Sequence, residues 1–132
     1  MAELAQGWIA DVERGPDWLI IRLSPPPRVS LPPWDGEDGA DLADTLWSLV
    51  ERHFTYRLLL ECEELTRLDS TLVAQLLVLD RRLHEHDGML RLCGLSELNQ
   101  QVLERCRLNG RFPSFRDRSH AVLGTSRPQQ PR

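Results

Sequence analysis

The sequence predicts a mixed α/β fold, in which a β-sheet of four to five strands opens with a β-hairpin and has α-helices packed against it. Three observations predict it: two strand-like runs around a tight turn come first, segments with helical periodicity follow, and short apolar runs separate those segments. Because strand–helix–strand units join parallel neighbours, we expect the later strands to pair in parallel and the hairpin to pair antiparallel.

The hairpin is predicted over residues 7–23. Residues 7–14 alternate between apolar and polar side chains, Gly15-Pro16-Asp17 is typical of a turn, and residues 18–23 form an apolar, partly β-branched run. The proline-rich loop 24–34 follows. Its consecutive prolines lack N–H donors, which excludes a central strand or a helix interior. We expect a stiff connector there, with a ligand for an aromatic groove as the alternative.

The middle of the chain predicts a helix, a buried strand and a second helix. Residues 41–53 carry leucine and valine at helical spacing, with a cluster of acidic residues before and at the start, where carboxylates suit the helix dipole. Residues 56–62 form a short, densely apolar segment around three consecutive leucines, as in a strand covered on both faces. Residues 72–87 repeat leucine at steps of four, three and four, which indicates an amphipathic helix with Gly88 as its C′ residue.

The last third predicts a strand over 89–94, a helix opening at Ser96, a short strand over 112–115 and a terminal helix over 119–123. The face of the helix that opens at Ser96 should carry Leu98, Val102 and Cys106, and Asn109-Gly110 should end it. We therefore expect a single domain over residues 1–124 and a flexible tail over 125–132, which is polar and contains two prolines.

Charge and hydropathy exclude several classes of function. The net charge of −4 has the wrong sign for a nucleic-acid-binding protein. Residues 1–70 hold 14 acidic and 6 basic side chains (−8), whereas residues 71–132 hold 6 and 10 (+4), so the chain has either ordinary solvated faces or a two-sided surface that steers a partner. No apolar run is long enough to span a membrane, and the N-terminal residues lack a secretory signal, so we expect a cytoplasmic protein.

The residues give no indication of a metal site, a cofactor or an enzyme. The three cysteines, Cys62, Cys93 and Cys106, lie in apolar segments without C-x-x-C spacing, and we expect buried thiols in a reducing compartment. His84 and His86 are two apart on a helix and would point to different faces. No glycine-rich phosphate loop or nucleophile motif occurs.

The segment Asp69-Ser70-Thr71 stands between the apolar strand and the long helix. Residues of these types commonly cap helices, and a plain cap is one interpretation. The other is a modification site, since the free N–H groups and the dipole of a helix N-terminus favour an anion such as a phosphate.

These residues resemble the STAS family, which includes the bacterial anti-sigma factor antagonists. The resemblance rests on the strand Arg57-Leu58-Leu59-Leu60-Glu61, the segment from Leu65 through Asp69-Ser70-Thr71, the long helix, and the later residues from His86 to Phe115. It covers roughly residues 7–123. It implies that Ser70 is phosphorylated by an anti-sigma factor that is itself a serine kinase, with Thr71 as a secondary acceptor. We expect the partner to contact Asp69, Ser70, Thr71, Leu72, Glu64 and Trp34, which lies in the proline-rich loop.

Two departures from the family pattern support an alternative function. Leu72-Val73 stands where relatives usually carry Gly-Leu, which would add bulk to the docking surface, and Leu23 runs into prolines where many antagonists have Gly-x-Leu-Asp. The resemblance thus implies a non-enzymatic anti-sigma factor antagonist switched at Ser70. The alternative is a constitutive STAS scaffold subunit of a signalling or lipid-transport assembly, without a phosphoswitch.

Overall fold

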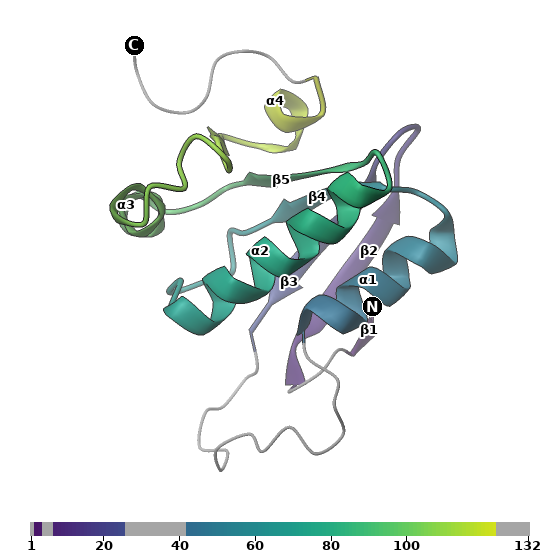
Figure 1. Ribbon diagram of the computed structural model, residues 1–132, viewed down its shortest axis with the longest axis horizontal. Coiled ribbons are helices and arrows are strands. Elements are labelled where there is room, and N and C mark those ends of the chain that lie inside the picture. The colour runs from purple at the N-terminus through teal and green to yellow at the C-terminus, as the bar shows by residue number, and fades with distance from the viewer. Residues whose placement is uncertain (1, 4–6, 26–41, 124–132) are drawn as a thin grey trace.

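The computed structural model describes residues 2–3, 7–25 and 42–123. In these residues six strands form one mixed sheet in the order β1-β2-β3-β4-β5-β6, and four helices pack against it (Figure 1). The strands are β1 (Ala2–Glu3), β2 (Ile9–Arg14), β3 (Leu19–Ser24), β4 (Arg57–Glu61), β5 (Met89–Cys93) and β6 (Ser114–Phe115). The helices are α1 (Leu42–His53), α2 (Ser70–Glu85), α3 (Glu97–Arg105) and α4 (Arg118–Leu123).

The pairing confirms the predicted topology. β1 and β2 pair antiparallel, as do β2 and β3, and the pairs from β3 to β6 are parallel. The predicted hairpin is β2–β3, in which Arg14 lies opposite Leu19. The sheet exceeds the expected four to five strands because β1, a strand of two residues, was not anticipated. Most of the proline-rich loop, including Trp34, and the tail 125–132 lie outside the described residues.

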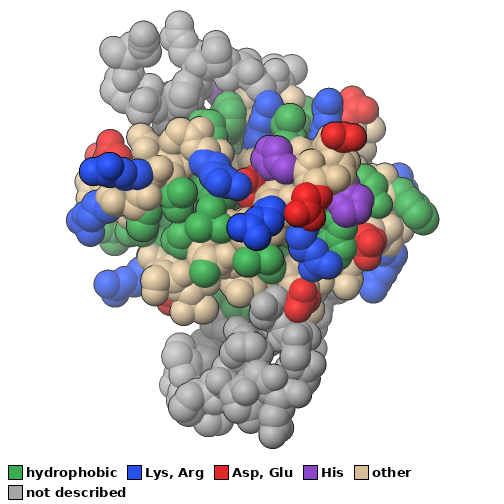
Figure 2. Space-filling model, viewed as in Figure 1, with side chains coloured by type: hydrophobic (Ala, Val, Ile, Leu, Met, Phe, Trp, Pro, Cys, Tyr) green, Lys and Arg blue, Asp and Glu red, His purple; other side chains and the backbone are tan. Residues whose placement is uncertain are grey.

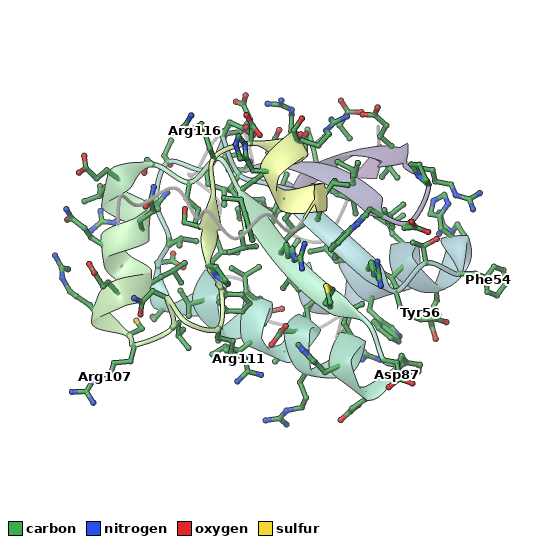
Figure 3. The ribbon with its side chains drawn as sticks, turned by 90° about the horizontal axis from the view of Figure 1, so that it is seen from above. Phe54, Tyr56, Asp87, Arg107, Arg111 and Arg116 are labelled. Carbon is green, nitrogen blue, oxygen red and sulfur yellow. The ribbon has the colours of Figure 1, made fainter. Side chains whose placement is uncertain are left out.

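The alternation of side chains along the central strands divides the core between the two faces of the sheet. Leu58 and Leu60 of β4 belong to the main core with α1, α2 and Leu103 of α3, whereas Leu59 belongs to a smaller cluster on the opposite face. That smaller cluster also contains Trp18, Ile20, Cys93, Phe115 and Ala121 of α4. Figure 3 shows α4 on one side of the sheet and α2 on the other. Both faces of β4 are therefore covered, as its densely apolar sequence predicted.

Each of the first three helices is followed, within two residues, by a residue other than glycine in the left-handed conformation. These residues are Phe54 (φ 52°), Asp87 (φ 60°) and Arg107 (φ 59°), all labelled in Figure 3. After α2 the N–H of Asp87 donates to the His84 carbonyl and that of Gly88 to the Leu83 carbonyl, which is a Schellman motif. The expectation of Gly88 at C′ is therefore wrong by one residue.

Glycine is required at position 88 for a different reason, which is lack of space. A Cβ at this position would collide with the backbone carbonyl of Tyr56, which accepts a hydrogen bond from the Met89 N–H at 3.0 Å. The close approach of the chain before β4 to the chain before β5 excludes any side chain there, even though the backbone conformation itself does not require glycine.

The predicted face of α3 is wrong for Leu98 and Cys106 but right for Val102, which is half-buried and packs against the main core. Leu98 is 56% exposed and Cys106 is exposed, while Asn99 and Leu103 are buried. The helix ends at Arg105, before the expected Asn109-Gly110 stop. Which face of α3 is buried depends on the partners that Asn99 contacts elsewhere in the chain, and not on the spacing of apolar residues within the helix. In the part of the chain that the structure describes, no helix is long and apolar enough to cross a bilayer.

Candidate functional site

The N-terminus of α2 places Ser70 on the surface. Asp69 is the N-cap in an extended conformation (φ −106°, ψ 177°), and its Oδ1 accepts a hydrogen bond from the Leu72 N–H at 2.8 Å. Ser70 is the first residue of α2, and both Ser70 and Thr71 are exposed. Because the first N–H groups of a helix have no intrahelical acceptor, those of Ser70 and Thr71 remain available to an anion.

The loop that precedes Ser70 is held in place on its buried side by Asn99 of α3. Leu65 and Leu68 are buried in the main core, and the fully buried Asn99 bonds to the backbone of both. Its Oδ1 accepts from the Leu68 N–H at 2.9 Å, and its Nδ2 donates to the Leu65 carbonyl at 3.3 Å. The amide side chain thus satisfies a donor and an acceptor that the loop would otherwise bury unpaired.

Asn99 is the site residue that the sequence analysis missed. The sequence offered one signal for it: Asn99 stands four positions before Leu103 and so shares its face, on a helix whose apolar spacing was ambiguous. Ser96 caps α3 by accepting from the Asn99 N–H at 3.1 Å, so the start of the helix and the anchor of the loop are set by neighbouring residues.

The three glutamates at the end of β4 and just after it differ in exposure. Glu63 and Glu64 have side chains 40% and 53% exposed, and Arg22 lies 3.5 Å from Glu64 Oε2. The sequence alone would group Glu61 with them as a charge at the rim of the loop, but its side chain is only 6% exposed. Its carboxylate accepts from Arg118 Nε at 2.9 Å and Nη2 at 3.2 Å, which attaches α4 to the sheet. These bonds and those to Glu13 raise the pKa of Arg118.

The predicted partner-binding residues are only partly brought together. Asp69, Ser70, Thr71 and Glu64 are exposed on one loop and the helix start that follows it. Leu72 is 5% exposed and packs in the main core, so its side chain adds no bulk to the surface. Trp34 lies outside the described residues.

The cysteines bear out the expectation of buried thiols in two cases of three. Cys62 and Cys93 are buried, and burial raises the pKa of both thiols, that of Cys93 to about 12. Cys106 is exposed, because it caps the end of α3 rather than facing the core. In the described ranges no three His, Cys, Asp or Glu side chains are grouped as metal ligands.

Comparison with known proteins identifies the family. The family model described as "Mlab, STAS domain" matches residues 33–123, more than half of the chain. The protein belongs to the STAS domain family. No protein with a curated description matches the sequence significantly.

Solved STAS structures share the fold at low sequence identity. An anti-sigma factor antagonist from Mycobacterium paratuberculosis is 13% identical with a TM-score of 0.66, over 93% of this chain and 97% of that one. An RsbS variant from Moorella thermoacetica is 10% identical with a TM-score of 0.65, over 87% and 92%. An anti-sigma factor antagonist (STAS) domain protein from Planctomyces limnophilus is 17% identical with a TM-score of 0.64, over 87% and 96%. At these identities the likeness shows the STAS fold.

Proposed function

We propose that this STAS domain is a non-enzymatic regulatory protein of the cytoplasm that binds an anti-sigma factor and releases it when Ser70 is phosphorylated. The observation that carries the proposal is the exposure of Ser70 at the first position of α2, directly after a loop whose other side is buried. A kinase can reach such a hydroxyl without unfolding the domain. The N–H groups of the first helical turn then stabilise the phosphate that is added.

The exposed side of α2 supports a binding surface that includes Ser70. Ser70, Ala74 and Val78 are spaced by four residues and are all exposed, so they form one stripe along the helix. Val78 is 46% exposed, and Leu98 of α3 is 56% exposed. Figure 2 shows hydrophobic side chains gathered over α2 and toward α3, with arginines around them. A partner lying along α2 would bury apolar side chains and contact Ser70 at the end of the same stripe.

The charge around Ser70 explains how phosphorylation would release the partner. Asp69 already places one negative charge beside Ser70, and a phosphate adds about −1.5 to −2 charges at neutral pH. An acidic partner surface that tolerates Asp69 alone would then face the phosphate as well, and such like-charge contacts cost several kcal/mol. This step requires no change in the fold of the domain.

The test is phosphate incorporation and partner binding by the full chain. A kinase-like anti-sigma factor encoded near this protein should phosphorylate it, and Ser70→Ala should abolish incorporation. Ser119→Ala removes another exposed serine, near the start of α4, and should leave incorporation unchanged. Ser70→Asp should weaken binding to that partner at least about tenfold.

The second candidate is a constitutive scaffold subunit, and the description of the matching family model as Mlab favours it. In that case the main partner recovered by affinity purification would be a transport ATPase or another STAS assembly. Binding would then be the same for the wild type and Ser70→Asp. That result, together with no phosphate incorporation, would reject the phosphoswitch and retain the binding surface on α2.

A further inference from the structure

Two arginines converge on one tryptophan on the face of the sheet that carries α4. The guanidinium carbon of Arg91 lies 5.1 Å from the centroid of the Trp18 ring, and that of Arg57 lies 5.8 Å from it. Trp18 is only 4% exposed and forms the floor beneath the two side chains. Since Leu59 lies opposite Arg91 in the β4–β5 register, Arg57 and Arg91 are diagonal neighbours on this face.

These two arginines differ from the other arginine that stacks on a tryptophan. Arg82 lies 4.9 Å from the Trp47 centroid, and its charge is balanced by Asp44 Oδ1 at 3.1 Å. Within the described residues neither Arg57 nor Arg91 has a carboxylate within salt-bridge distance. Two positive charges therefore lie together, with no carboxylate of the described part of the chain between them.

The structure around Arg91 holds it in this position. Its Nη1 donates to the Ala121 carbonyl at 2.6 Å, and its guanidinium also lies 5.5 Å from the Phe115 centroid. Burial, and then repulsion by Arg57, lower the pKa of Arg91. Arg57 is exposed at the start of β4, and its guanidinium is not fixed by a carbonyl as that of Arg91 is, so it can move to meet a ligand.

We propose that Arg57 and Arg91, held over the Trp18 ring, bind the phosphate group of a small phosphorylated molecule. A phosphate monoester has three terminal oxygens in a tetrahedral arrangement, so it can accept hydrogen bonds from two guanidinium groups that approach from different directions. A carboxylate is planar and pairs best with the fork of a single arginine. Binding would also neutralise the repulsion between the two side chains.

This site is independent of the proposed phosphoswitch. Arg57 is at the beginning of β4, whereas Ser70 follows the loop after the end of β4, and the arginines lie on the face of the sheet opposite α2. Loss of phosphate binding here would leave the proposal for Ser70 untouched, and the reverse also holds.

The experiment is a titration of the full chain, labelled with ¹⁵N-arginine, at constant ionic strength. The probes are inorganic phosphate, glycerol 3-phosphate and acetate, and the readout is the NMR shift of each arginine Nε–Hε group. We expect both phosphates to give saturable shifts of Arg57 and Arg91 with one shared dissociation constant. Arg57→Gln should weaken binding about tenfold or more, because a charged hydrogen-bonding partner is lost.

Arg82→Gln is the matched control, since it removes the other stacked arginine and should leave phosphate affinity unchanged. Arg57 is the informative position because it is exposed, so its substitution should not disturb the fold. Shifts that stay linear, or an Arg57→Gln variant that binds phosphate as tightly as the wild type, would overturn the site. Equal affinity for acetate would overturn the assignment to phosphate. Saturation by inorganic phosphate but not by glycerol 3-phosphate would overturn the assignment to a phosphorylated molecule.

Discussion

Replacing Asn99 by alanine should destabilise the protein far more than its place on a surface helix suggests. The substitution removes the acceptor for the Leu68 N–H at 2.9 Å and the donor to the Leu65 carbonyl at 3.3 Å, and both backbone groups stay buried. An unsatisfied buried group costs about 1–3 kcal/mol, and the longer bond to the carbonyl belongs at the low end of this range. Alanine regains up to about 0.7 kcal/mol of helix propensity.

The expected net loss is roughly 2–3 kcal/mol in the free energy of unfolding. Urea unfolding followed by tryptophan fluorescence measures it, and the slope against denaturant should stay constant. Gln100→Ala is the control on the same helix, because Gln100 is half-buried and donates one bond to the Leu95 carbonyl at 3.0 Å. It should cost only about 0.5–1.5 kcal/mol.

Hydrogen exchange provides a local readout of the same substitution. The Leu68 amide should lose protection in Asn99→Ala while the amides of β4 keep theirs relative to global stability. If Asn99→Ala costs no more than Gln100→Ala, or if the Leu68 amide remains equally protected, Asn99 does not anchor the loop and the reasoning fails.

Three further substitutions test other features of the structure. Phe54→Gly should stabilise the protein by about 1 kcal/mol in thermal unfolding, because Phe54 is 82% exposed and left-handed; a loss of stability would contradict this. Arg118→Met should cost about 2–3 kcal/mol in urea by leaving the buried Glu61 carboxylate poorly paired, and a neutral effect would show that α4 is held otherwise. Cys93 has a pKa raised from 9.0 to about 12, so its contribution to stability is complete below pH 9.0 and lost as pH rises toward about 12. Cys93→Ala should flatten the alkaline fall in stability, and an unchanged pH profile would refute the assignment.

The central elements were predictable because their sequence patterns have a single structural solution. A run such as Leu58-Leu59-Leu60 can be buried on both sides only in a strand covered by two layers, and the structure provides α2 on one face and α4 on the other. The leucine spacing of α2 and the capping side chain of Asp69 were likewise sufficient to predict this helix and its start from the local sequence.

The errors occurred where a residue's environment depends on partners distant in sequence. Asn99 is buried because the loop backbone 31 to 34 residues earlier requires its amide, and no periodicity within α3 encodes that requirement. Glu61 is buried because Arg118 lies 57 residues later. Leu72 could not be assigned to the core or the surface before the position of the loop that precedes it was known.

The same long-range contacts determine what kind of switch this site could be. Leu65, Leu68 and Asn99 hold the loop in place from the core side, so Ser70 sits on a rigid support. Phosphorylation of an exposed hydroxyl there would change the charge at a fixed position, and the helix N-terminus would stabilise that charge by about 0.3–1 kcal/mol. The free domain should therefore keep or slightly gain stability on phosphorylation. Release of a partner would arise from repulsion across the interface, which distinguishes an electrostatic switch from one that works by local unfolding.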